Sequence, residues 1–65
     1  MQREYVENKI KNKNCFVYYN NGDIREVSYL GGGTYIFNGI TSDNLKFIIN
    51  MIMELGSVSH ISNIK

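Results

Sequence analysis

The shortness of the chain limits most strongly what it can fold into. With 65 residues it forms one domain at most. A domain of this size buries only about 60% of the surface that its unfolded chain exposes. Such domains therefore often depend on a disulfide, a metal or a second subunit. Cys15 is the only cysteine, which excludes a disulfide within the chain and favours a reducing compartment.

The remaining ways to supplement a small core are a metal site and association. Cys15 and His60 are the only strong zinc ligands, fewer than a closed zinc site needs, so we expect no metal and no cofactor. We expect instead a homo-oligomer, dimeric or larger, or a bound partner protein. No apolar run reaches the roughly 18 residues of a membrane span, and the first residues do not resemble a signal peptide. These features predict a cytoplasmic protein.

The clearest local signal is a β-hairpin. Residues 15–19 and 24–29 are rich in aromatic and β-branched side chains, which favour strands. Between them lies Asn21-Gly22, the preferred pair for a two-residue type I′ turn. The sequence therefore predicts two antiparallel strands joined at this point.

A two-residue turn also predicts the register of the hairpin. Tyr19 would pair with Ile24, and Phe16 would pair with Val27. In that register both faces of the hairpin carry several apolar side chains, whereas a hairpin with one solvated face alternates more cleanly. We therefore expect another element to cover part of the second face.

The best-formed helix is predicted at residues 43–55, in a segment that runs from 42 to 55. Its polar side chains lie opposite a broad apolar stripe. The stripe consists of Leu45, Ile48, Ile49, Ile52 and Met53. Residues 41–43, Thr-Ser-Asp, offer a choice of N-caps.

The other segments complete the predicted order α-β-β-β-α. Residues 1–14 form a basic, peripheral segment with a weak helix, residues 34–37 a third strand, and residues 57–65 an edge strand or a free tail. The sequence predicts one domain over residues 1–65 of the α+β class. It would be a small antiparallel sheet of three or four strands, with the 43–55 helix packed on one face.

A run of glycines is the first candidate site. Gly31, Gly32, Gly33 and Thr34 could form a loop whose bare backbone approaches a ligand such as a phosphate. A P-loop, however, needs a lysine and a following helix, and here a strand is predicted to follow. The simpler interpretation is a flexible or bulged connection between two strands.

Tyrosines are the second candidate. Tyr18, Tyr19, Tyr29 and Tyr35, together with Arg25, are predicted to lie on the sheet. Tyrosine is enriched at protein interfaces, which makes this set a candidate partner-binding surface. The same rings could stack on a nucleotide, or they could be ordinary half-buried residues of strands.

Basic and catalytic residues give weaker signals. Arg3, Lys9, Lys11 and Lys13 could contact the phosphates of a nucleic acid, but the net charge of the chain is only +1. The carboxylates are scattered, and His60 has no marked nucleophile beside it. We therefore expect a protein that is not an enzyme.

No motif in the chain indicates a family. Short cytosolic domains without motifs are common among phage and mobile-element accessory proteins, many of which, including anti-CRISPR and other anti-defence proteins, inhibit a host protein by occluding it. Stoichiometric binding needs no catalytic residues. We therefore expect an inhibitor that binds a host protein. The alternatives are an oligomeric sponge that sequesters a nucleotide signal and a small nucleic-acid-binding protein.

Overall fold

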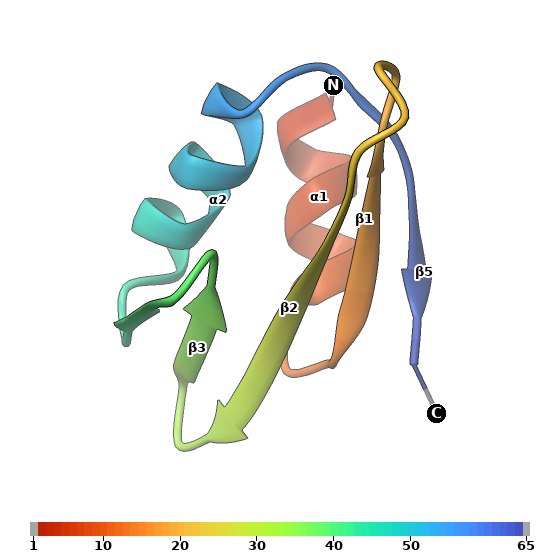
Figure 1. The fold of residues 1–65 in the computed structure, drawn as a ribbon. Coiled ribbons are helices and arrows are strands. Elements are labelled where there is room, and N and C mark those ends of the chain that lie inside the picture. The colour runs from red at the N-terminus through yellow and green to blue at the C-terminus, as the bar shows by residue number, and fades with distance from the viewer. Residues whose placement is uncertain (1, 65) are drawn as a thin grey trace.

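The fold is an antiparallel sheet with two helices on one side, seen in a computed structural model that describes residues 2–64 (Figure 1). Along the chain the elements are α1 (Gln2–Ile10), β1 (Cys15–Tyr19), β2 (Ile24–Gly31), β3 (Thr34–Phe37), β4 (Ile40–Ser42), α2 (Leu45–Glu54) and β5 (Val58–Asn63). The strands lie in the order β4-β3-β2-β1-β5. The predicted α+β class is confirmed, and the sheet has five strands where three or four were predicted.

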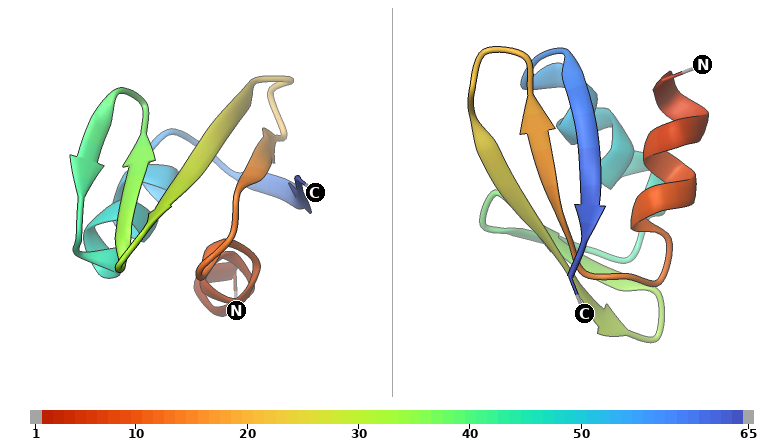
Figure 2. Two further views of the ribbon diagram at one scale, coloured as in Figure 1. Left: turned by 90° about the horizontal axis from the view of Figure 1, so that it is seen from below. Right: turned by 90° about the vertical axis from the view of Figure 1, so that its right-hand side faces the viewer.

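Both helices cover the same face of the sheet. α1 contacts β5, and α2 contacts β3 and β4. Turning the molecule brings β5, β1 and β2 to the front, with no helix before them (Figure 2, right). The sheet therefore has one face packed against helices and one that is open to solvent, as is common for antiparallel sheets.

The register of the β1–β2 hairpin differs by one residue from the predicted one. Its loop has three residues, because the Tyr19 amide donates to the Asp23 carbonyl (2.9 Å) and the Gly22 amide donates to the Tyr19 carbonyl (3.0 Å). Gly22 has a φ of +95°. This is the other common hairpin turn, in which the residue after a type I turn adopts the left-handed conformation and forms a bulge.

This shift decides which side chains share a face. Val27 pairs with Cys15 rather than with Phe16, and both Val27 and Cys15 are fully buried. Phe16 pairs with Glu26 instead. Cross-strand partners point to the same side of a sheet, so Cys15, Val17 and Val27 share the core face, with Arg25 exposed at its end, while Phe16, Tyr18 and Ile24 lie on the other face with Glu26.

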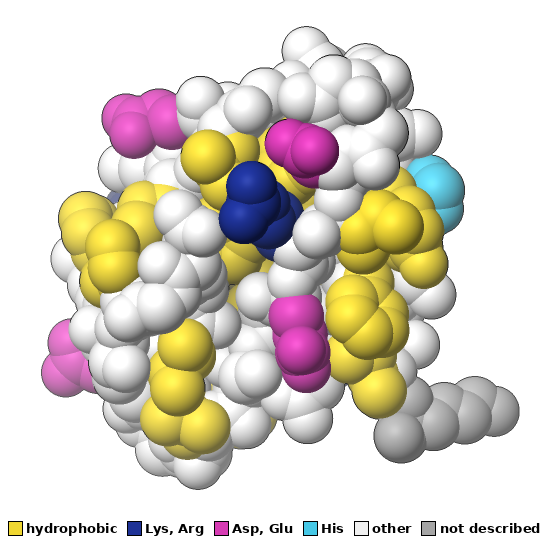
Figure 3. Space-filling view, in the orientation of Figure 1, with side chains coloured by type: hydrophobic (Ala, Val, Ile, Leu, Met, Phe, Trp, Pro, Cys, Tyr) yellow, Lys and Arg dark blue, Asp and Glu magenta, His cyan; other side chains and the backbone are white. Residues whose placement is uncertain are grey.

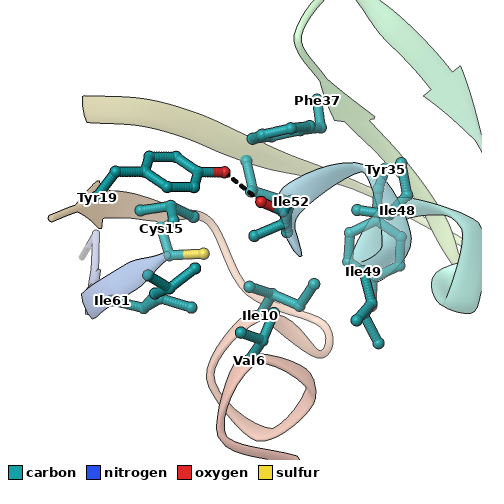
Figure 4. Packing of buried hydrophobic residues seen from close by; sticks show 13 residues of the cluster. Val6, Ile10, Cys15, Tyr19, Tyr35, Phe37, Ile48, Ile49, Ile52 and Ile61 are labelled. Carbon is teal, nitrogen blue, oxygen red and sulfur yellow. Dashed lines mark hydrogen bonds between the residues drawn. The ribbon is translucent and has the colours of Figure 1, made fainter. Parts of the chain in front are cut away.

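Buried side chains from every layer meet between the sheet and the helices (Figure 4). Phe37 is the largest of those that are fully buried. The set comprises Val6, Ile10, Cys15, Val17, Tyr19, Val27, Tyr35, Phe37, Ile48, Ile49, Ile52, Val58 and Ile61. Tyr19 enters this apolar region with its polar group satisfied, because its hydroxyl donates to the carbonyl oxygen of Ile52 (2.7 Å).

α1 is more than the peripheral segment that the sequence predicted. Its apolar stripe is thin, but both of its members, Val6 and Ile10, are fully buried. The helix also lies along the outer edge of β5, where the Ile61 amide donates to the Tyr5 hydroxyl (2.9 Å) and the Gln2 side chain donates to the Val58 carbonyl. Covering an edge strand in this way prevents another chain from pairing with it.

One strand, β4, was not predicted, and another, β5, was predicted as one of two alternatives. Residues 41–43 were interpreted as a choice of N-caps, but residues 40–42 form β4 after a tight turn at Asn38 and Gly39, where both φ values are positive. The helix then begins later, at Leu45, with Asn44 as its N-cap accepting from the Phe47 amide (3.2 Å). Of the two interpretations given for the tail, the structure has the edge strand, β5, which pairs with β1.

Two buried acidic groups predict that the fold weakens at alkaline pH. Burial raises the pKa of the Cys15 thiol from 9.0 to about 11, and burial raises the pKa of the Tyr19 hydroxyl from 10.0 to about 12. As the pH rises, the unfolded chain loses these protons before the folded chain does. The contribution of each group to the free energy of unfolding is therefore complete below pH 9 and is lost as the pH rises toward 12. We expect the free energy of unfolding to fall by on the order of 2 kcal/mol per group.

The measurement is urea denaturation at a series of pH values from 8 to about 12. Cys15→Ala and Tyr19→Phe each remove one titrating group, so each variant should show a shallower decline than the wild type. Parallel declines in all three proteins would show that neither group is responsible.

Candidate functional site

The open face of the sheet is the candidate site. Side chains of β1 alternate, so that Phe16 and Tyr18 point away from the helices while their neighbours in the strand are buried. Cross-strand pairing extends this face over the other strands. The term "open face" is used below for the residues on this side of the sheet, which are Phe16, Tyr18, Ile24, Glu26, Ser28, Ile36, Thr41, His60 and Ser62. Phe16 is 37% exposed and Ile24 is 55% exposed.

Tyr18 and His60 form the most ordered pair on the open face. They are cross-strand neighbours on β1 and β5, and their rings stack with centroids 4.4 Å apart and an angle of 7° between the planes. In the space-filling view the histidine lies beside a group of hydrophobic side chains (Figure 3). A flat aromatic pair next to apolar side chains is a rigid surface suited to contact.

Two tyrosines of the predicted partner-binding set belong to the core. Tyr19 and Tyr35 are 4% and 2% exposed. The Tyr19 hydroxyl donates to Ile52, and the Tyr35 hydroxyl accepts from the Asn12 amide (2.8 Å), which closes the turn between α1 and β1. Neither side chain is accessible to a partner in this fold, which corrects their assignment to a binding surface.

Two further tyrosines also serve the fold. The half-buried Tyr29 packs against the Tyr35 ring, with centroids 5.0 Å apart, and its hydroxyl accepts from the Gly33 amide (3.1 Å). Tyr5 accepts from β5 as described above. Within residues 2–64, Tyr18 is therefore the one tyrosine whose hydroxyl is not bonded to the backbone of another segment.

Arg25 does not join Tyr18 either. It pairs with Val17, so it lies on the helix side of the sheet, and its guanidinium donates to the Asn38 side chain (3.4 Å). The five predicted residues thus do not form one surface. Sequence reasoning did not include Phe16 or His60 in the candidate surface. The neighbours of Phe16 depend on the register of the hairpin, and the place of His60 depends on the pairing of β5 with β1.

The glycine loop is explained by the hairpin between β2 and β3. Gly31, Gly32 and Gly33 have φ values of +90°, +61° and +83°, a region that favours glycine. The register shifts between Tyr29 and Gly31, so the predicted bulge is present. Thr34 begins β3 and pairs with Gly31. Open space surrounds each of these glycines, so the backbone conformation and not a close approach requires them.

The predicted nucleic-acid residues lie away from the open face. Arg3 and Lys9 are on α1, which covers the opposite face of the sheet, and Lys11 and Lys13 follow in the exposed turn after it. The Lys9 ammonium lies 5.9 Å from the centroid of the Tyr5 ring, a cation–π contact within one helix. Binding of nucleic acid by these residues stays a prediction.

The described residues, 2–64, form no pocket, and they hold no group of three or more His, Cys, Asp or Glu side chains gathered as for a metal ion. None of its helices has the length and apolar character to cross a membrane. Comparison of the chain with protein families, with curated proteins and with solved structures gives no match.

Proposed function

We propose that this chain acts by stoichiometric binding of another protein through the open face of its sheet. One observation carries the proposal. Phe16 and Tyr18 stay accessible on a face that no helix covers, while the other tyrosines are used by the fold. Exposed aromatic residues in a cluster are the usual anchors of protein interfaces.

The composition of the open face supports the same proposal. Glu26 is its only acidic residue, and it has no lysine or arginine. Protein interfaces are depleted in charged residues, and a group of exposed apolar residues typically marks a contact site. The hydroxyl groups of Ser28, Thr41 and Ser62 could bond to a partner's backbone.

The consequence of binding would be inhibition by occlusion. A small, flat binder adds no chemistry, but it blocks whatever surface of the partner it covers. We propose that the partner is a host protein and that the chain is an accessory protein of a phage or mobile element, as its short, motif-free sequence suggests. The anti-defence role belongs to this proposal as well.

Replacing both aromatic anchors tests the proposal. The variant Phe16→Ser with Tyr18→Ser should fold, because both side chains lie outside the core, and should lose at least 100-fold in affinity, as expected when two hot-spot residues are removed. The protein to measure against is the one that an immobilised wild-type chain retains from a lysate of the cells in which it is naturally made.

A matched control comes from the other side of the molecule. Phe47 on α2 is 43% exposed, similar to Phe16, so Phe47→Ser makes the same chemical change away from the open face. This control should retain the same protein with unchanged affinity in calorimetry. Equal affinity for the wild type and the Phe16→Ser, Tyr18→Ser variant would refute the proposed function.

A further inference from the structure

The position of the one carboxylate on the open face carries an inference about the partner. Glu26 lies on β2, the central strand of the sheet, and pairs directly with Phe16. It is exposed. Any protein that covers Phe16 and Tyr18 therefore also covers Glu26, or lies immediately beside it.

Among residues 2–64, no lysine or arginine lies on the open face with this carboxylate, and the one histidine there, His60, is stacked on Tyr18. Arg25 is next to Glu26 in the chain, but it points to the other side of the sheet and donates to Asn38. The other basic residues of the structure lie on α1, in the turn after it and on α2. Removing a carboxylate from water without a cation or hydrogen-bond donors is strongly unfavourable.

We propose that the occupant of the open face is a different protein, one that presents an arginine or lysine from an apolar surface. The cation would pair with Glu26 while the surrounding apolar side chains contact Phe16 and Tyr18. Arginine suits this position better than lysine, because its guanidinium can bond both carboxylate oxygens and is more weakly hydrated. This inference rests on the proposed function and specifies its partner.

The same argument disfavours a second copy of the chain on this face. A two-fold contact uses the same patch from both subunits, so it would bring two copies of Glu26 into one interface in which His60 is the one basic side chain that each face offers. Like charges in such a contact are repulsive. The expected homo-oligomer, if it forms, would therefore use another surface.

Charge reversal at one position tests the inference. Three immobilised baits are compared on the same lysate: the wild type, Glu26→Arg, and Glu54→Arg, which makes the identical charge change at an exposed residue of α2. We expect the wild type and Glu54→Arg to retain the same protein and Glu26→Arg to lose it. In calorimetry with that purified protein, affinity should fall by at least 100-fold for Glu26→Arg and about 10-fold for Glu26→Gln.

The cation on the partner is then located by replacing its surface arginines and lysines with glutamate. One such variant should bind the Glu26→Arg chain more tightly than it binds the wild type, which a merely structural effect of the substitution would not produce. Unchanged affinity of Glu26→Arg would overturn the inference, as would a wild-type dimer in native mass spectrometry that the Phe16→Ser, Tyr18→Ser variant cannot form.

The two proposals fail in different ways. If Phe16→Ser with Tyr18→Ser abolishes retention and Glu26→Arg does not, the open face binds protein but the partner needs no cation there. If both variants bind as the wild type does, or if the wild type retains nothing, the proposed function fails as well.

Discussion

Replacing Phe37 by alanine is expected to leave most of the chain unfolded at 37 °C. Phe37 is the largest of the fully buried side chains, and deleting a buried phenylalanine side chain typically costs about 3–5 kcal/mol. A domain of this length is stable by roughly 3–10 kcal/mol in all. Circular dichroism with thermal and urea denaturation would measure the loss.

The matched control is Phe16→Ala. It is the same chemical change in the same sheet, on β1 instead of β3, but on the open face, where 37% of the side chain is exposed. Phe16→Ala should lower the free energy of unfolding by less than about 1 kcal/mol. Similar losses for the two variants would mean that the sheet is not divided into a core face and an open face.

Replacing Ile10 by alanine should have the second largest effect. Ile10 is fully buried and supplies, with Val6, the contact between α1 and the core. Its truncation should cost about 2–5 kcal/mol, because a helix this short does not form without tertiary packing. Asn8→Ala, at an exposed position of the same helix, is the control and should cost little. If Ile10→Ala lowered the free energy of unfolding as little as the control does, α1 would be peripheral to the stability of the fold, as the sequence predicted.

Much of the fold could be predicted because the local signals were strong. The third strand lies where the aromatic and β-branched run placed it, at residues 34–37. The main helix, predicted at 43–55, spans Leu45–Glu54. Periodicity of apolar residues reports which face of an element is buried, and in this helix Ile48, Ile49 and Ile52 are the buried residues.

The register of the first hairpin was the consequential error. Asn21-Gly22 suits a two-residue turn, but the same residues suit a three-residue turn with glycine in the left-handed position. A shift of one residue changes which side chains of β2 lie beside those of β1. It pairs Val27 with the buried Cys15 and places Glu26 beside Phe16.

The roles of the tyrosines could not be predicted from sequence. Their hydroxyl partners are distant in the chain, as for Tyr5 with Ile61 and Tyr19 with Ile52. Composition alone therefore gave all of them the same weight. The tertiary structure separates them, because it uses four hydroxyls internally and leaves Tyr18 on the open face with His60.

Thiol reactivity at two neighbouring positions tests most directly that β1 has a closed side and an open side. Cys15 is fully buried, so in the wild type it should react with Ellman's reagent at pH 8 only when the chain opens, at least 100-fold more slowly than in the unfolded chain. In the variant Cys15→Ala with Phe16→Cys, the thiol should react at close to the unfolded rate. A rapidly reacting Cys15 beside a protected thiol at position 16 would contradict the account, because the surface proposed to bind a partner would then be the core.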